Sequence, residues 1–285
     1  MTNCHIFTIN NIDISQSEAK KLGITVIPLK VRFNNIEYID DVTITNEEFF
    51  NRLVESDELP KTSQLTPFDY TNAFDMVDKN DKAIVICLSG NLSGTYNSAL
   101  LAASDYPNIY VVDSKNVTIG QRLLVLRALE LIKEYNDIEK ILNILESEKE
   151  NIRLVALLDT LEYLKKGGRI SATTAIVGGL LNIKPVLAIE DGKIVSIGKA
   201  RGSKNGNNKL REKIEQYHGI DYKKPYAVAY SGLDDSLLEK YISDSKDLCD
   251  KDLPKILIGS VIGTHIGPGA IAVAFFSNGD DLDAK

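Results

Sequence analysis

Small hydroxyl-bearing and glycine residues gather in one segment, Ser89-Gly90-Asn91-Leu92-Ser93-Gly94-Thr95-Tyr96. The apolar run at residues 83–88 precedes it and is typical of a strand buried on both faces. Residues 96–103 follow and favour a helix, so the segment is predicted to be a tight turn from a strand into a helix. The unpaired N–H groups of a helix start, with Ser93 near them as a cap, make a receptor for a carboxylate or phosphate. The alternative interpretation is an ordinary capped turn without a ligand.

Three further polar residues have the types that bind an anion. Thr62 and Ser63 lie in residues 60–67, a segment with two prolines that is predicted to be extended and ordered. Their hydroxyls either donate to a ligand or bond to their own backbone. His265 lies beside Gly267-Pro268-Gly269 and either contacts the same ligand or shapes a turn.

Ser93 and His265 also permit a different function, serine hydrolysis. The serine precedes the histidine, as in α/β-hydrolases. The nucleophile elbow of that fold requires Gly-x-Ser-x-Gly, whereas this chain has Gly90-Asn91-Leu92-Ser93-Gly94. Hydrolysis therefore stays the alternative hypothesis.

The composition argues against several classes of protein. The chain has 285 residues, a net charge of −7 and no long basic run, so nucleic-acid binding is not expected. No apolar stretch approaches the roughly 20 residues of a membrane span, and residues 1–5 lack the features of a signal peptide, so a cytoplasmic location is expected. The three cysteines and three histidines lack zinc-site spacing, so neither a metal nor a cofactor is expected.

Predicted strands and helices alternate through the first half of the chain. Strands are expected at 4–9, 24–33, 83–88, 109–112 and 153–158, and helices at 15–22, 45–54, 66–76, 96–103, 119–135 and 138–149. Such alternation favours a parallel sheet covered by helices on both faces. Ligands of such sheets bind at the carboxyl ends of the strands, where both hydroxyl-bearing segments would lie.

The second half predicts a mixed sheet. Asp191-Gly192 separates the runs 183–190 and 193–199 and is a strong hairpin signal. Helices near 160–166, 205–217 and 236–246 alternate with strands near 226–230, 256–258 and 270–276. The predicted fold class is therefore α/β with two domains, a parallel-sheet domain at 1–160 and a mixed-sheet domain at 161–278, followed by a flexible tail at 279–285.

Six segments together resemble the DegV family, in the order in which the family has them. They are Lys61-Thr62-Ser63-Gln64, Leu88 to Ala99, Leu161 to Ser171, Leu181 to Leu187, Arg201-Gly202 and His265 to Gly269. The resemblance covers about residues 4–277, and the six motifs are weak singly but strong in this order. It implies two α/β domains with a long-chain fatty acid buried between them.

Members of this kind are the acyl-carrier subunits of bacterial fatty-acid kinase. The resemblance implies that the chain presents the fatty-acid carboxylate to a separate ATP-dependent acyl kinase of the dihydroxyacetone-kinase-like type, giving acyl phosphate for phospholipid metabolism. The chain has no Gly-x-x-x-x-Gly-Lys-Ser/Thr, so it is expected to be a carrier without catalytic residues of its own. Transient membrane contact fits such a role. A sensor of small anions that binds no lipid is a third interpretation.

The resemblance also implies roles for particular residues. The carboxylate is expected to meet Thr62, Ser63, Ser93, Gly94, Thr95 and His265. Arg169 and Arg201 are expected to face the kinase or its nucleotide, or else to be solvated charges. The apolar residues expected as core or as tail contacts are Ile170, Ile176, Val177, Leu180, Leu181 and Ile183.

One position departs from the family pattern. Family members usually have a first strand that ends in Thr-Asp-Ser, whereas this chain has Thr8-Ile9-Asn10. The change is expected either to alter partner choice or to affect only the hydrogen bonding of the loop.

Overall fold

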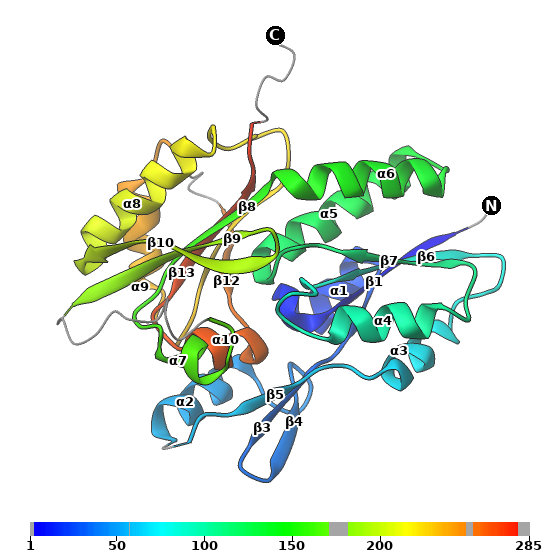
Figure 1. Ribbon diagram of the computed structural model, residues 1–285, viewed down its shortest axis with the longest axis horizontal. Coiled ribbons are helices and arrows are strands. Elements are labelled where there is room, and N and C mark those ends of the chain that lie inside the picture. The colour runs from blue at the N-terminus through cyan, green and yellow to red at the C-terminus, as the bar shows by residue number, and fades with distance from the viewer. Residues whose placement is uncertain (1–2, 57, 171–181, 249–252, 279–285) are drawn as a thin grey trace.

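The structure is a computed structural model that describes residues 3–56, 58–170, 182–248 and 253–278. Its first layer is a parallel sheet with the strand order β2-β1-β6-β7 (Figure 1). The strands are β1 (Cys4–Ile9), β2 (Ile24–Ile27), β6 (Lys82–Cys87) and β7 (Ile109–Asp113). All three pairings are parallel, and β6 is buried from Ala83 to Cys87, as the apolar run predicted.

Local signals in the sequence set where the flanking helices begin. These helices are α1 (Gln16–Leu22), α3 (Pro67–Phe74), α4 (Thr95–Ala103), α5 (Thr118–Glu134) and α6 (Ile138–Glu148). Ser15 caps α1, Asp137 caps α6, and Thr66 forms a capping box with Asp69 while Pro67 takes the first helical position. These predicted helix starts are confirmed.

The second layer is a mixed sheet with the order β10-β9-β8-β13-β11-β12. Its strands are β8 (Ile152–Leu157), β9 (Ile183–Glu190), β10 (Lys193–Arg201), β11 (Tyr226–Tyr230), β12 (Lys255–Leu257) and β13 (Ile271–Phe276). Asp191 and Gly192 form the predicted hairpin turn, with φ of 48° and 73°. Among the described strands of this sheet, only β11 and β12 pair in parallel.

The assignment of residues 153–158 to the parallel sheet is wrong. This segment is β8, which pairs antiparallel with both β13 and β9. Two consecutive helices, α5 and α6, separate β7 from β8, whereas a single crossover helix usually returns a chain to the same parallel sheet.

A third, small sheet was not expected from the sequence. Its order is β4-β3-β5, all antiparallel, with β3 (Lys30–Phe33), β4 (Ile36–Ile39) and β5 (Lys61–Ser63) beside α2 (Asn46–Glu55). The single strand expected at 24–33 is wrong, because it breaks at Pro28, whose missing N–H cannot continue a ladder. Asn10 stabilises the break, since its Oδ1 accepts from Leu29 N at 2.7 Å and its Nδ2 donates to Asp40 O at 3.2 Å.

Helix α5 lies between the two large sheets and contacts β1 and β6 on one side and β8, β11 and β13 on the other (Figure 1). Its first two turns are buried, so the main core lies between the sheets around it. The remaining helices are α7 (Glu162–Lys166), α8 (Gly202–Gln216), α9 (Ser236–Asp244) and α10 (Ser260–Ile266). None of the helices within the described residues is long and apolar enough to span a bilayer.

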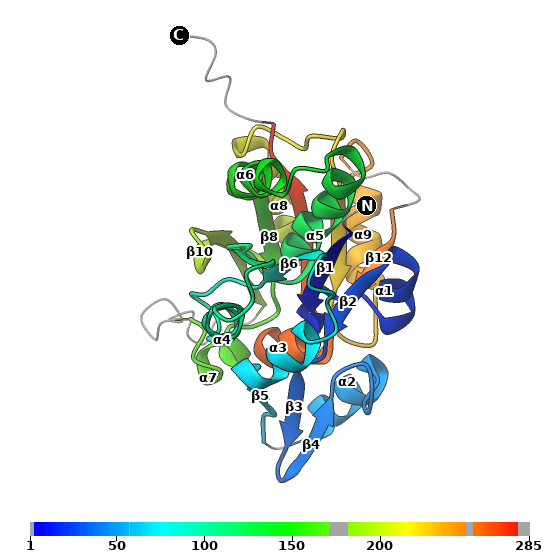
Figure 2. The ribbon, with the colours of Figure 1, turned by 90° about the vertical axis from the view of Figure 1, so that its right-hand side faces the viewer.

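Helix α10 joins the small sheet to the rest of the molecule. It contacts α2, β3 and β5 on one side and α7 on another, and Figure 2 shows it below the ends of the large sheets. The sequence predicted only a loop near His265, because a seven-residue helix between Gly259 and Gly267 has too few turns for a periodic pattern. The expected tail at 279–285 lies outside the described residues.

Candidate functional site

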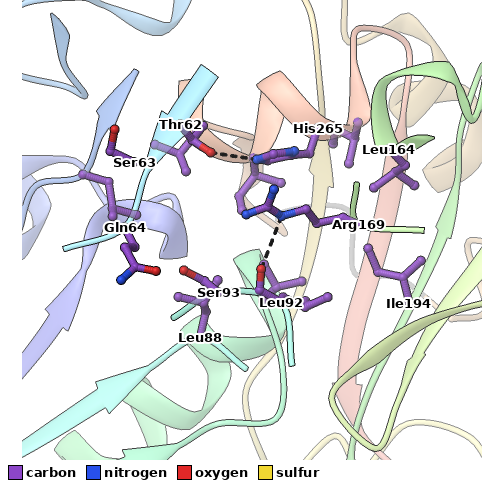
Figure 3. Close-up of a pocket in the computed structure, with 15 residues that line it drawn as sticks. Thr62, Ser63, Gln64, Leu88, Leu92, Ser93, Leu164, Arg169, Ile194 and His265 are labelled. Atoms are coloured by element: carbon purple, nitrogen blue, oxygen red, sulfur yellow. Dashed lines mark hydrogen bonds between the residues drawn. The ribbon is translucent and has the colours of Figure 1, made fainter. Parts of the chain in front are cut away.

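A cavity lies where the carboxyl end of β6 meets β5, α7 and α10 (Figure 3). The open space in and around it, solvent at its mouth included, is about 620 Å³. Its polar side chains are Thr62, Ser63, Gln64, Ser93, Arg169 and His265. Its apolar side chains are Leu29, Leu88, Leu92, Val117, Leu164, Ile194, Val261, Ile262 and Ile266. The lining therefore comes from the parallel-sheet half, the small sheet and the mixed-sheet half together.

Thr62 and His265 meet across the cavity although 203 residues separate them. Thr62 lies on β5 opposite Val31 of β3, and His265 lies in the last turn of α10. Thr62 Oγ1 and His265 Nε2 are 2.9 Å apart. Burial, and then the nearby Arg169 guanidinium, lower the pKa of His265 to about 4. The imidazole is therefore neutral at pH 7.

The surroundings of the ring indicate which nitrogen carries the proton. Nδ1 of His265 is buried without a hydrogen-bond partner in the described structure, and it faces Gly167, where an added Cβ would lie 2.4 Å away. A buried N–H without an acceptor is rarer and costlier than a lone pair without a donor. We therefore assign the proton to Nε2, which donates to Thr62 Oγ1. The Thr62 hydroxyl is then free to donate its own proton into the cavity.

The turn at 89–96 brings Ser93 to the same cavity. Its Oγ accepts from Thr95 N at 3.2 Å and lies 2.9 Å from Thr95 Oγ1. Gly94, not Ser93, is the N-cap of α4. Ser93 precedes the N-cap, and its side chain still accepts from the N–H of Thr95, the first residue of the helix. A side chain at Gly94 would collide with Gln64, since its Cβ would lie 2.2 Å from Oε1. Glycine thus lets the turn lie against the end of the Gln64 side chain, which would have to move for any larger residue.

Thr95 does not line the cavity. It is fully buried, and its Oγ1 accepts from Leu65 N at 3.4 Å. The structure therefore places Thr95 behind Ser93, where it ties the turn to the residues that follow β5. Gly94 likewise lies against Gln64 rather than in the lining.

The two arginines lie in different places. Arg169 follows Gly168, whose φ is 69°, and is exposed at the mouth of the cavity. Its Nε donates to Leu92 O at 3.3 Å (Figure 3). Its Nη1 donates to Gly167 O at 2.6 Å. Arg201 ends β10, is exposed and does not line the cavity. The structure thus brings Arg169, but not Arg201, to the hydroxyls and His265.

Most of the apolar lining was not predicted from the sequence. Ile176, Val177, Leu180 and Leu181 lie outside the described residues, whereas Ile170 belongs to the main core. Val261, Ile262, His265 and Ile266 line the cavity from one face of α10, but a helix of seven residues is too short for this spacing to be recognised in advance. Gln64 gave a usable signal, because it directly follows Thr62 and Ser63.

The geometry does not assemble a serine hydrolase. His265 Nε2 bonds to Thr62 rather than to Ser93, and Nδ1 has no carboxylate to orient the ring within the described structure. Serine hydrolysis requires a nucleophile hydrogen-bonded to a base, and a third group that orients the base. No group of three or more His, Cys, Asp and Glu side chains among the described residues could hold a metal ion.

Taken together, the fold and the site define a class: an α/β protein with an apolar cavity that ends at converging neutral donors and one arginine. Such a lining suits a small molecule with a long apolar part and one polar end. The chain belongs to the DegV family, whose model matches residues 4–278.

Individual relatives agree with this membership. A DegV domain-containing protein from Caldanaerobacter subterraneus is 34% identical over 95% of this chain and 97% of its own length. A fatty-acid-binding DegV family protein from Thermus thermophilus is 30% identical, with a TM-score of 0.84 over 97% of this chain and all of that one. A stearic acid-binding protein from Eubacterium ventriosum is 27% identical, with a TM-score of 0.82 over 96% of this chain and 97% of that one.

Proposed function

We propose that this protein binds one long-chain fatty acid, with the tail in the apolar part of the cavity and the carboxylate at Thr62, Ser93 and His265. The observation that carries the proposal is that these three polar side chains line the same cavity as nine apolar ones. The solved relatives described as fatty-acid-binding support the same ligand class. Ser63 and Gln64 complete the polar end.

The tail supplies most of the binding free energy in this proposal. Each buried methylene contributes about 0.8 kcal/mol, so a chain of a dozen contributes roughly 10 kcal/mol before the costs of association. The polar groups then mainly fix where the carboxylate lies. This division explains why the lining has many aliphatic side chains but few donors.

The neutral donors suit a carboxylate that must react later. Thr62, Ser93 and the neutral His265 can hold the carboxylate by hydrogen bonds without a tight ion pair. One carboxylate oxygen then stays available to attack the γ-phosphorus of ATP. The new O–P bond forms as the bond to the bridging oxygen of ADP breaks, which gives acyl phosphate and ADP.

In this proposal the ATP comes from a separate acyl kinase of the dihydroxyacetone-kinase-like type, because the chain has no P-loop motif. The protein is then a cytoplasmic carrier that supplies phospholipid metabolism and touches the membrane only to collect its fatty acid. Arg169 at the mouth and Arg201 on the outer surface are the residues that we assign to the kinase or its nucleotide.

The direct test is to purify the protein under native conditions, denature it, extract it with solvent and quantify fatty acids by mass spectrometry. We expect close to one fatty acid per chain, or full loading after incubation with a series of acids. Protein that stays lipid-free with every acid would overturn the proposal. Kinase coupling is tested separately by acyl-phosphate formation when loaded protein, ATP and such a kinase are combined.

A further inference from the structure

Two carboxylates outside the cavity hold the first residues of α10. Asp40 follows β4 and is 2% exposed, and its Oδ1 accepts from Ser260 N at 3.3 Å and from Ser260 Oγ. Asp13 accepts from Gly259 N at 2.8 Å through Oδ1, and from Thr118 Oγ1 through Oδ2. Both contacts span more than half of the sequence, so the start of α10 is held by the N-terminal half of the chain.

Helix stability alone does not account for these carboxylates. Burial raises the pKa of Asp13 to about 7 and that of Asp40 to about 6. The folded structure therefore disfavours the ionised form of both carboxyl groups. Within the described structure neither carboxylate forms an ion pair with a lysine or arginine. A serine or asparagine would cap the helix without burying a charge.

The position of α10 matters for the cavity, because the helix supplies part of the lining. Four of its residues line the cavity, namely Val261, Ile262, His265 and Ile266. His265 is the fifth residue after Ser260, which places it about 8 Å further along the helix axis. A displacement at the start of this short helix therefore reaches the imidazole directly. Asp13 also accepts a hydrogen bond from Thr118, and the residue before Thr118, Val117, lines the cavity.

Other contacts restrain the middle and the end of α10. Gly263 lies against Phe49 and Phe50, where an added Cβ would approach ring atoms to 2.8 and 2.9 Å. Gly267, with φ of 70°, lies under the Tyr163 ring. Neither contact is directional along the helix axis, whereas the hydrogen bonds at Gly259 and Ser260 are.

We infer that Asp13 and Asp40 are positioning residues of the carboxylate site, which place His265 against Thr62 by fixing the start of α10. The inference rests on the proposed function for its role in binding. The geometry that it concerns, the bond between His265 Nε2 and Thr62 Oγ1, can be followed with or without a fatty acid.

The test compares Asp40→Ala, which removes the acceptor, and Ser260→Ala with a matched control, Asp137→Ala. Asp137 also caps a helix, accepting from Glu139 N at 3.0 Å and Lys140 N at 3.2 Å, but it does not contact the cavity. The titration of the imidazoles is followed by NMR with ¹⁵N-labelled histidine. The chain has only three histidines, and His265→Gln identifies the signal. Fatty-acid affinity is measured on the same samples.

We expect Asp40→Ala to raise the pKa of His265 from about 4 toward its ordinary value, because a displaced ring is less desolvated. Affinity should fall about tenfold, and Ser260→Ala should shift both readouts in the same direction by less. Asp137→Ala should lower the melting temperature, because α6 loses its cap, and leave both readouts unchanged.

Folded Asp40→Ala and Ser260→Ala proteins with the wild-type titration of His265 would overturn the inference. If Asp40→Ala does not fold, Ser260→Ala decides, because it removes only the hydroxyl and keeps the backbone bond to Asp40. If the wild-type protein binds no fatty acid, the proposed function fails, while the titration still decides whether the carboxylates position His265.

Discussion

The polar end and the apolar wall of the cavity are held in place in different ways. At the polar end, Thr62, His265, Ser93 and Arg169 take part in hydrogen bonds, which join Thr62 to His265, Thr95 to Ser93 and Arg169 to Leu92. In the apolar wall, Leu29, Leu88, Val261 and Ile262 are members of the main core and are fixed by packing. Hydrogen bonds are directional, whereas packing of aliphatic side chains tolerates changes of shape. The wall should therefore set affinity, and the polar end should set the placement of the carboxylate.

A charge in the apolar wall should have the largest effect. Ile194→Asp places a carboxylate on a partly buried strand residue that lines the cavity. An unpaired charge in such a place costs about 3–5 kcal/mol, so binding should weaken by two to three orders of magnitude or more. Ser196→Asp is the control, because Ser196 lies on the same strand but is exposed and outside the lining. Equal lipid content in the two variants would contradict the role of this wall.

The next largest effect concerns His265 and pH. Its folded pKa of about 4 lies below the ordinary value of 6.5, so between these values the unfolded chain binds more protons. Stability should therefore fall as the pH falls from 6.5 to 4, by about 3 kcal/mol for this group. His265→Gln removes this contribution but keeps Asp13 and Asp40, which titrate in the same window with the opposite sign. Urea unfolding at several pH values measures the difference, and parallel curves for the two proteins would contradict a buried neutral histidine.

Removing one donor at the polar end should have an intermediate effect. Thr62→Val and Ser93→Ala each remove a hydroxyl with little change in core volume. A hydrogen bond to a charged group contributes about 1.5–3 kcal/mol, so acyl-phosphate formation should drop by roughly tenfold to a hundredfold. Because the tail still binds, fatty-acid content should fall less than turnover. Thr71→Val, on α3 and outside the lining, is the control. Unchanged turnover in both site variants would show that the carboxylate lies elsewhere.

Substitution of the two arginines should have the smallest effect on fatty-acid affinity. Arg169→Ala and Arg201→Ala should leave fatty-acid affinity within about twofold, since both side chains are exposed, but should impair phosphorylation by the kinase. Lys165→Ala is a control from the exposed surface of α7. If a variant loses thermal stability and bound lipid together, its arginine instead stabilises the contact between the two halves of the chain.

The helix boundaries were predictable because their signals are local. The Ser15, Thr45 and Asp137 caps and the Asp191-Gly192 turn act within four residues of themselves, so no knowledge of distant contacts is needed. The partner of a strand is not local information. β8 reads as another buried strand, and only its place between β9 and β13 shows which sheet it joins. The break at Pro28 was readable, but the small sheet that follows depends on pairing between β3 and β5.

The sequence by itself determined the residue types of the candidate site, namely hydroxyls at Thr62 and Ser93, an imidazole at His265 and an arginine at 169. Tertiary structure alone decided which of them meet, because the contact between Thr62 and His265 closes a loop of 203 residues. It also decided that His265 is neutral, since desolvation depends on what packs around the ring. The positions of Asp13 and Asp40 behind α10 follow from the same long-range packing, which no spacing along the chain encodes.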